Sequence, residues 1–281
     1  MTDLSDFLLE PLVRSALAED LAPWGDATSR AVIPADLQGA VVMQAREEGR
    51  VSGMQVAAMA FRLIDPTLTI EITAADGVLC RPGQRLMRIS GNMASILMAE
   101  RVALNFAGRL SGIATMTAAF VSAAGAARIT CTRKTAPGLR LVEKAAVRHG
   151  GGANHRYGLG DAILIKDNHI AAAGGIRAVL ERVKAARSHM MRVEIEVDML
   201  DQLAEVLDIG GADCVLLDNM DNATLTRAVQ MVGGRLITEA SGNMSLSRIP
   251  GVAATGVDYI SVGGLTHSAP SLDIGLDYEQ G

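Results

Sequence analysis

The sequence predicts an α/β protein, with an irregular parallel β/α barrel that follows an N-terminal α+β domain. After residue 125, short apolar segments alternate with amphipathic ones, which is typical of parallel βαβ units. The first hundred residues differ, because turn signals such as Asp76-Gly77 and Pro82-Gly83 separate short strands there. The chain has 281 residues, which suffices for two domains of ~100 to 200 residues each.

The composition excludes several classes of protein. Hydrophobic residues make up 49% of the chain and the formal net charge is only −5, so a disordered chain is excluded. The pI of about 5.6 argues against a nucleic-acid-binding protein. We find no apolar run of ~20 residues and no basic, apolar export signal, so we expect no membrane partner and a cytoplasmic protein. The three cysteines are too far apart to form a CxxC pair, which favours reduced thiols.

The expected N-terminal domain covers residues 1–110. It begins with an amphipathic helix over residues 7–19, and strands follow at 40–46, 69–73 and 86–90. A mostly apolar helix over 93–110 carries Arg101, Asn105 and Arg109 at i, i+4 and i+8, on one face. We expect residues 268–281 to pack with this domain.

The expected barrel covers residues 111–267 and contains six strand and helix units. Six such units in a row fit a barrel better than an open sheet. The predicted strands are 128–133, 161–166, 192–197, 213–218, 235–240 and 257–262. The predicted helices are 139–149, 175–187, 199–209, 222–231 and a short one near 245–249.

Polar residues follow each predicted strand of the barrel. Catalytic groups of β/α barrels lie at the carboxyl ends of the strands, so these residues are the candidates for a site. In chain order they are Thr132-Arg133-Lys134-Thr135, then Lys166-Asp167-Asn168-His169, Glu194 and Glu196, Asp218-Asn219, Glu239-Ala240-Ser241-Gly242, and Ser261-Val262-Gly263-Gly264. Cations come first, carboxylates next, and small residues last.

The segment 128–166 carries a formal charge of +6 inside an acidic chain, which favours an anionic ligand. Its members Arg140, Lys144 and Arg148 are spaced i, i+4, i+8, and we expect them on a solvated helix face. The other cations stand at strand ends or in a glycine-rich loop. Because arginine grips carboxylates and phosphates bidentately, these cations predict a substrate with several negative groups. They are Arg133, Lys134, Arg156 and Lys166.

Carboxylates and glycines predict the rest of the site. Period-two alternation places Glu194, Glu196 and Asp198 on one strand face, and together with Asp218 they suit Mg²⁺ or sugar hydroxyls. The Ser-Gly and Gly-Gly pairs after the last two strands suit a phosphate, although glycine also serves ordinary turns. His155 fits either a ligand contact or a loop hydrogen bond. No histidine has the spacing of a zinc motif, so we expect no zinc.

Several of these segments together resemble one enzyme family, quinolinate phosphoribosyltransferase, also called nicotinate-nucleotide pyrophosphorylase (carboxylating). The resemblance runs collinearly along nearly the whole chain. The segments are ERVALNF (100–106), TRKT (132–135) followed by PGLR (137–140), GGANHR (151–156), LIKDNHI (164–170), LDNM (217–220), EASG (239–242) and GVDYISVG (256–263). Small departures are Ala136, Ala153 and Asn243, which affect fine positioning.

The resemblance implies transfer of a phosphoribosyl group from phosphoribosyl pyrophosphate to quinolinate with decarboxylation. The products would be nicotinate mononucleotide, pyrophosphate and CO₂, in de novo NAD biosynthesis, with Mg²⁺ as cofactor. It also implies a homodimer with shared active sites, or a higher oligomer of dimers.

The resemblance further implies a role for each candidate residue. Lys134, Lys166, Glu196 and Asp218 would be catalytic, and Glu196 and Asp218 would also hold the metal and the ribose hydroxyls. Lys134 would face the pyrophosphate. Quinolinate would lie among Arg133, His155, Arg156 and Lys166, with Arg101 reaching in from a neighbouring subunit. The 5′-phosphate would meet Ser241, Gly242, Gly263 and Gly264, with His267 at its border.

Three alternatives remain open at this stage. A similar group linked to molybdenum transport shares the Thr-Arg-Lys-Thr and His-Arg signatures, but it lacks the run from Lys166 to His169. Lys166 at a strand end also suits a Schiff base, as in barrel lyases. A non-catalytic anion sensor would bind quinolinate alone, and it would need no second phosphate site.

Overall fold

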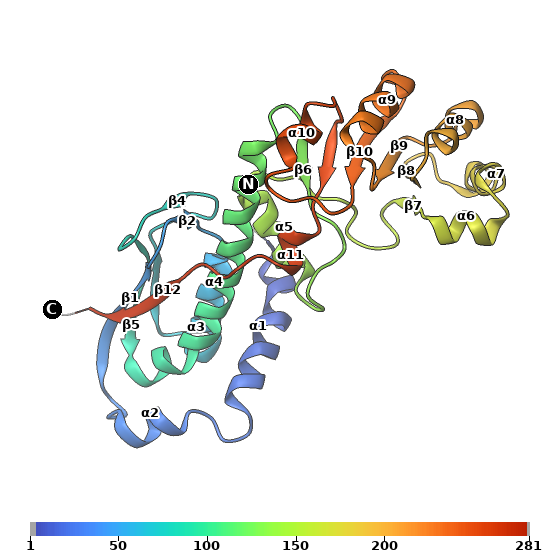
Figure 1. The fold of residues 1–281 in the computed structure, drawn as a ribbon. Helices are drawn as coiled ribbons and strands as arrows, with labels where there is room; N and C mark the ends of the chain where they lie inside the picture. Colours follow the sequence, from blue (N-terminus) through green and yellow to red (C-terminus); the bar gives the residue numbers. More distant parts are fainter. Residues whose placement is uncertain (1–3, 280–281) are drawn as a thin grey trace. The chain divides into compact units, whose positions relative to one another are not determined.

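The computed structural model describes residues 4–279, which form two compact units. The first unit contains the residues up to 118, residues 136–151 and the residues from 268 onward. The second unit contains residues 119–135 and 152–267. Figure 1 shows the course of the chain through both units. Among the described residues, no helix is both long and apolar enough to cross a membrane.

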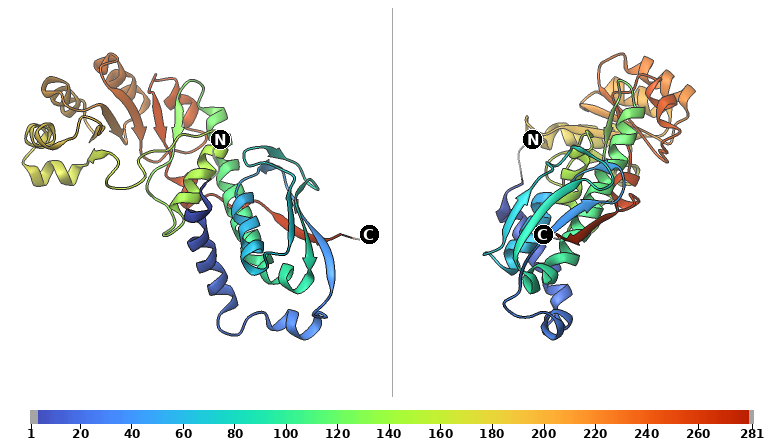
Figure 2. Two further views of the ribbon diagram at one scale, coloured as in Figure 1. Left: turned by 180° about the vertical axis from the view of Figure 1, so that it is seen from behind. Right: turned by 90° about the vertical axis from the view of Figure 1, so that its left-hand side faces the viewer.

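The first unit combines an antiparallel sheet with helices. Its four-stranded sheet has the order β12-β1-β5-β3, and Figure 2 shows β12 alongside β1. Helix α3 packs against α1. The elements are α1 (Asp6–Leu21), α2 (Ala27–Val32), β1 (Gln38–Ala45), β2 (Gly49–Arg50), α3 (Met54–Ile64), β3 (Thr69–Ile72), β4 (Leu79–Cys80), β5 (Arg85–Asn92), α4 (Met93–Ala123), α5 (Arg140–His149) and β12 (Ile274–Tyr278). The predicted N-terminal helix and three strands are therefore confirmed to within a few residues.

Helix α4 is longer than the sequence predicts. It continues to Ala123 and does not stop at residue 110. Its second half contains hydroxyl residues, which weaken a helix when they compete for backbone groups. Here Thr115 and Thr117 donate instead to the carbonyls one turn earlier, at 2.7 Å each, and these bonds fit inside the helix. The boundary predicted between residues 110 and 111 lies within α4 and stays a prediction.

Helix α5 has no face that is fully exposed to solvent, because its residues 142–147 are buried and the other residues are half-buried. Lys144 is only 3% exposed, and Arg140 and Arg148 are half-buried, so the predicted solvated face is wrong. Glu143 is fully buried, and its carboxylate accepts hydrogen bonds from Arg109 at 2.6 Å and from the Ala136 N–H at 3.1 Å. A spacing of i, i+4, i+8 indicates that residues lie on the same face of a helix, but it does not indicate whether that face is exposed to solvent.

The second unit is built on a six-stranded parallel sheet. Its order is β6-β11-β10-β9-β8-β7, and the short helices between its strands follow the β/α pattern. The strands are β6 (Arg128–Thr130), β7 (Ile163–Ile165), β8 (Val193–Val197), β9 (Cys214–Asp218), β10 (Ile237–Ser241) and β11 (Tyr259–Ser261). The helices are α6 (Asp167–Ala173), α7 (Ile176–Ala186), α8 (Leu200–Ile209), α9 (Asn222–Val232), α10 (Ile249–Ala253) and α11 (Gly264–His267).

The predicted fold class is confirmed, and the barrel is irregular as expected. Strands β6 and β7 are the two ends of the sheet order, so the backbone hydrogen bonds of residues 4–279 form an open series. Helices α7, α8 and α9 pack side by side along the sheet (Figure 1). Burial alternates along β8, where Val193, Ile195 and Val197 are buried and the intervening glutamates are not fully buried.

Two short helices differ from the prediction. Helix α6 begins directly after Lys166, and the Lys166 N–H donates to His169 Nδ1 at 2.9 Å, so the 166–169 run starts a helix. Helix α10 begins at Ile249 rather than near residue 245. Pro250 stands in the first turn of α10, where its fixed φ and its missing N–H are tolerated.

Candidate active site

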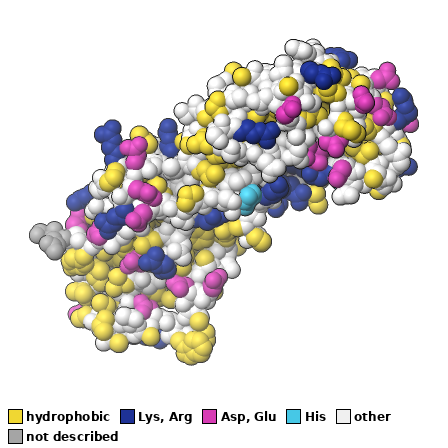
Figure 3. All heavy atoms as spheres, viewed as in Figure 1, with side chains coloured by type: hydrophobic (Ala, Val, Ile, Leu, Met, Phe, Trp, Pro, Cys, Tyr) yellow, Lys and Arg dark blue, Asp and Glu magenta, His cyan; other side chains and the backbone are white. Residues whose placement is uncertain are grey.

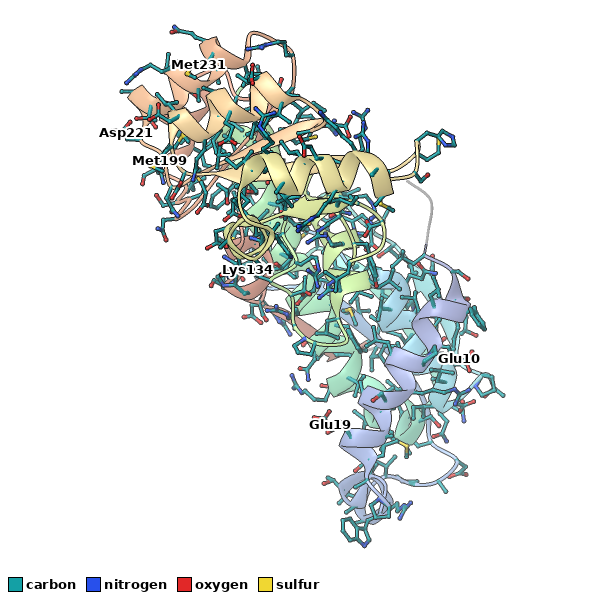
Figure 4. All side chains as sticks on the ribbon, turned by 90° about the vertical axis from the view of Figure 1, so that its right-hand side faces the viewer. Glu10, Glu19, Lys134, Met199, Asp221 and Met231 are labelled. Atoms are coloured by element: carbon teal, nitrogen blue, oxygen red, sulfur yellow. The ribbon has the colours of Figure 1, made fainter. Side chains whose placement is uncertain are left out.

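A cavity of about 540 Å³ lies at the carboxyl ends of the strands of the second unit. It combines cations, carboxylates and glycine-containing loops from all six strand ends. Figure 4 labels Lys134, on the loop that follows β6. The lining residues are Thr132, Arg133, Lys134, His155, Arg156, Leu164, Lys166, Glu196, Leu216, Asp218, Asn219, Glu239, Ser241, Gly242, Asn243, Met244, Ser261 and Gly263.

Two arginines supply the cationic wall. The Arg156 guanidinium donates through Nη1 to the Ala162 carbonyl at 3.0 Å. The Nε atoms of Arg133 and Arg156 are buried and have no hydrogen-bond partner among the described residues. Burial lowers the pKa of Arg156, and repulsion from Arg133 lowers it further. Two crowded guanidinium groups with unsatisfied donors favour a ligand with more than one carboxylate.

His155 is held at both ring nitrogens. Its Nδ1 accepts the N–H of Arg156 at 2.7 Å, and its Nε2 lies 2.9 Å from Glu194 Oε2. Because an accepting nitrogen carries no proton, this geometry assigns the neutral tautomer with hydrogen on Nε2, which donates to Glu194. The ring therefore stands between the cationic loop and the carboxylates of the sheet.

Glu239 lies behind His155 and is only 6% exposed. Its Oε1 has no hydrogen-bond partner among the described residues and lies 3.8 Å from His155 Nε2. Burial, reinforced by repulsion from Glu194, raises the pKa of Glu239 to about 7, against a smaller opposing effect of a hydrogen bond with Ser261. This carboxyl group therefore keeps its proton to a higher pH than an exposed glutamate does.

His155, Glu194 and Glu239 together have the composition of a metal site. One ligand atom of each lies within 4.8 Å of the others. A metal-bound imidazole must present a nitrogen lone pair to the ion, but the Arg156 N–H occupies that of Nδ1 and Nε2 faces Glu194. The arrangement thus favours a hydrogen-bonded histidine and carboxylate pair.

Two other carboxylates line the cavity and suit Mg²⁺. Glu196 Oε2 accepts a hydrogen bond from Lys166 Nζ at 2.8 Å, and Asp218 Oδ2 accepts one from Asn219 Nδ2 at 2.6 Å. Mg²⁺ prefers hard oxygen ligands and is usually bound by one or two carboxylates together with substrate phosphates. The donor set of Glu196 and Asp218 fits that requirement.

The glycine-containing loops complete the opposite wall. Gly242 adopts φ +98°, and a Cβ there would collide with Asn219 Oδ1, so only glycine fits. A Cβ on Gly263 would lie 3.2 Å from both His267 Nε2 and Lys134 Cδ. The loop after β11 therefore approaches both the loop after β6 and α11, which contains His267.

The structure brings ten of the predicted site residues together and places three elsewhere. Gly264 and His267 are the first and last residues of α11, beside the cavity lining rather than in it. Arg101 is an exposed residue of α4 in the first unit. The ten residues that line the cavity are Arg133, Lys134, His155, Arg156, Lys166, Glu196, Asp218, Ser241, Gly242 and Gly263. Their individual roles stay predictions.

The sequence places Asn219 and Glu239 at predicted strand ends and Asn243 directly after one, but it assigns none of the three a role, and all three line the cavity. Alternation along β10 contained the signal for Glu239, because residues 239 and 241 point to the same side of the strand. On the face drawn in Figure 3, Lys and Arg side chains of the second unit lie close to Asp and Glu side chains.

Comparison with known proteins identifies the family. Models of the N-terminal and C-terminal domains of quinolinate phosphoribosyl transferase match residues 26–111 and 113–277. A nicotinate-nucleotide pyrophosphorylase [carboxylating] of Arabidopsis thaliana is 44% identical over 95% of this chain and 82% of its own length. A probable nicotinate-nucleotide pyrophosphorylase of Bacillus subtilis is 40% identical over 96% and 93%. The structure of the nicotinate-nucleotide pyrophosphorylase from Francisella tularensis has a TM-score of 0.93 at 38% identity, covering 99% of this chain and 98% of that one. This chain belongs to the quinolinate phosphoribosyltransferase family.

Proposed function

We propose that the cavity at the strand ends is where this chain carries out the reaction of its family. The chain transfers a phosphoribosyl group from phosphoribosyl pyrophosphate to quinolinate and removes a carboxylate, which yields nicotinate mononucleotide for NAD biosynthesis. Pyrophosphate and CO₂ are the other products. The observation that supports this location best is the combination, in one cavity of about 540 Å³, of unsatisfied arginine donors, two oxygen-rich carboxylates and glycine-containing loops.

Quinolinate fits the cationic wall. Its two carboxylates match the guanidinium groups of Arg133 and Arg156, whose buried Nε atoms have no partner among the described residues. Lys166 adds a third cation, which Glu196 holds at 2.8 Å. His155 helps to fix the backbone at Arg156, because its Nδ1 accepts a hydrogen bond from the Arg156 N–H at 2.7 Å. This wall orients the pyridine nitrogen toward the sugar donor.

Phosphoribosyl pyrophosphate fits the remaining walls. Its 5′-phosphate suits the loops at Ser241, Gly242 and Gly263, with Gly264 and His267 of α11 beside them. Its ribose hydroxyls suit Glu196 and Asp218. Mg²⁺ held by these two carboxylates would neutralise charge on the pyrophosphate as it leaves. Lys134, whose side chain approaches Gly263, supplies a further positive charge for the leaving group.

The two chemical steps place different demands on the protein. In the first, the pyridine nitrogen displaces pyrophosphate from the ribose, and cations that stabilise the leaving group lower the barrier. In the second, the carbon–carbon bond to the adjacent carboxylate breaks, CO₂ leaves, and the cationic ring stabilises the electron pair until a proton binds there. The protein mainly holds the substrate during this second step.

The test of the function is direct. The protein is incubated with quinolinate, phosphoribosyl pyrophosphate and Mg²⁺, and formation of nicotinate mononucleotide and release of CO₂ are followed together. Equal amounts of both products support the proposal. Absence of both would refute it, whereas CO₂ without the nucleotide would indicate a different decarboxylation.

Lys134 is tested separately. We expect Lys134→Ala to slow the chemical step more than it weakens quinolinate binding, because the lysine acts on the leaving group. Pre-steady-state kinetics separates the two effects, and an unchanged rate of the chemical step would contradict the assignment. Lys166, paired with Glu196, serves as the comparison, since its loss should raise the KM for quinolinate.

Family membership also bears on two of the alternatives from the sequence, the Schiff-base lyase and the anion sensor. Membership supports phosphoribosyl transfer over a Schiff-base lyase or a non-catalytic sensor. For Lys166, borohydride treatment in the presence of a carbonyl substrate should trap no covalent adduct. A trapped adduct would reopen the lyase hypothesis.

We further propose a cytoplasmic homodimer, or a higher oligomer of dimers, with shared sites. Exposed Arg101 would reach the quinolinate of the partner subunit. Two inactive variants, Arg101→Ala and Lys134→Ala, should therefore regain part of the activity when their subunits exchange. Exchange without any regained activity would contradict a shared site.

A further inference from the structure

One arginine outside the cavity lining holds two of its loops. Arg248, the residue before α10, donates through Nη1 to the Gly242 carbonyl and through Nη2 to the Met220 carbonyl, at 2.8 Å each. Gly242 belongs to the loop after β10, and Met220 to the loop after β9. The guanidinium fork therefore bridges the loop that carries Ser241 and Gly242 to the loop that carries Asp218.

These two bonds fix the direction of two peptide groups. In a trans peptide the C=O and the N–H point in opposite directions. When the Gly242 carbonyl faces Arg248, the N–H of Asn243 therefore points away from Arg248. Asn243 lines the cavity, and within residues 4–279 neither its N–H nor that of Gly242 donates to a protein group. These donors are available to an anion.

The backbone of this loop needs such support. Gly242 and Asn243 both adopt positive φ, at +98° and +48°. For asparagine this left-handed conformation is less favourable than the right-handed one. Neighbouring contacts help to hold it, since the Asn219 N–H donates to the Ser241 carbonyl at 3.0 Å and Asn243 Nδ2 to Asn219 Oδ1 at 3.4 Å. Of the donors named here for the loop, only the Arg248 guanidinium carries a charge.

Arg248 also brings a charge that no carboxylate neutralises. No Asp or Glu of the described part of the chain forms an ion pair with it. Its side chain is half-buried, and its two terminal nitrogens donate to the carbonyls of the two loops. Lysine cannot replace this fork, because an ammonium group lacks the planar, divergent donors that reach two carbonyls at once.

We propose that Arg248 is a positioning residue for phosphoribosyl pyrophosphate. It holds the loops at 218–220 and 241–243 so that backbone N–H groups face the phosphate before the substrate binds. This inference rests on the proposed function of the cavity. It assigns Arg248 no contact with substrate, and it predicts a defect in binding of the sugar donor rather than of quinolinate.

The chain offers a matched control. Arg235 also donates to two backbone carbonyls, through Nε to Val232 at 3.1 Å and through Nη2 to Met231 at 2.7 Å. It precedes β10, at the amino end of the strand, whereas the cavity lies at the carboxyl end. If the effect of replacing such an arginine were only a general loss of stability, both replacements would show it, whereas a positioning role predicts a defect in phosphoribosyl pyrophosphate binding only for Arg248.

The test measures binding and turnover for Arg248→Met, Arg248→Lys and Arg235→Met. Calorimetry gives the Kd of phosphoribosyl pyrophosphate with Mg²⁺, and steady-state kinetics gives KM for each substrate. Loss of hydrogen bonds to a charged group predicts a Kd at least ~10-fold higher for both Arg248 variants. The KM for quinolinate and the thermal midpoint should stay near those of the unaltered protein, and Arg235→Met should bind normally.

Three outcomes overturn the inference. One is an unchanged Kd in Arg248→Met. Another is an equal defect in Arg235→Met, which would indicate general destabilisation. The third is full rescue by Arg248→Lys, which would reduce the role to charge alone. If the unaltered protein binds phosphoribosyl pyrophosphate but makes no nucleotide, the proposed function fails and the binding comparison still decides the role of Arg248. If it does not bind, both proposals fail.

Discussion

The buried carboxyl group of Glu239 makes the free energy of unfolding depend on pH, and one substitution should remove that dependence. Burial raises the pKa of Glu239 from 4.5 to about 7, and the nearby Glu194 adds to this effect. The native state therefore holds this proton more tightly than the unfolded chain does. The resulting stabilisation is complete below pH 4.5, and it is lost as the pH rises through about 7.

The size of the effect follows from the pKa. Each pKa unit corresponds to about 1.36 kcal/mol. A pKa that moves from 4.5 in the unfolded chain to about 7 in the native protein thus changes the free energy of unfolding by about 3 kcal/mol. Glutamine has nearly the same shape but releases no proton, so Glu239→Gln removes this pH dependence.

The assay is urea unfolding of the unaltered protein and of Glu239→Gln from about pH 5 to about pH 8.5. The stability of the variant relative to the unaltered protein should rise by about 2 to 3 kcal/mol across that range, because part of the effect is already lost between pH 4.5 and pH 5. Glu205→Gln, at an exposed position of α8, is the control and should show a flat difference. A flat difference for Glu239→Gln as well would refute the reasoning, and a falling one would reverse its sign.

Three further predictions follow from other sites. Glu143→Ala should lower the free energy of unfolding by ~3 to 5 kcal/mol, because it removes the fully buried carboxylate that Arg109 binds. Glu10→Ala, at the exposed pair with Arg14, should lower it by under ~1 kcal/mol, and equal losses of the two variants in urea unfolding would contradict this. Gly242→Ala should raise the KM for phosphoribosyl pyrophosphate ~10-fold or more, because the added Cβ collides with Asn219. Gly174→Ala, at a similar φ but with open space around it, should leave that KM unchanged, and normal kinetics of Gly242→Ala would argue against a rigid loop. Removal of Mg²⁺ with a chelator should abolish turnover, and added Mg²⁺ should restore it; activity that persists would exclude an essential metal.

The sequence predicts the strands and the site of the second unit because both obey simple geometric rules. Parallel strands buried on both faces give apolar runs, and the residues after each run must gather at one edge of the sheet. Ten predicted site residues line one cavity for that reason. The resemblance of the motifs to one family then predicts which chemistry those residues serve.

Other features depend on tertiary packing, which local patterns do not encode. The spacing of Arg140, Lys144 and Arg148 is compatible with either a solvated or a buried face, and the structure buries Lys144. Similarly, the sequence leaves the role of His155 open, because one of its two hydrogen-bond partners, Glu194, lies 39 residues away along the chain. The raised pKa of Glu239 arises from burial behind that histidine.

The pairing of β12 with β1 constrains the order in which the chain can fold during synthesis. Val41 pairs with Tyr278 and Ala45 with Ile274, so the outer edge of β1 is covered only by residues from the far end of the sequence. A ribosome must therefore translate the entire second unit while that edge of β1 still offers unpaired backbone groups. Uncovered strand edges invite association with other chains. The first unit contains the earliest residues of the sequence, yet it is completed last. A chain whose synthesis stops before residue 274 should therefore need chaperones to avoid aggregation.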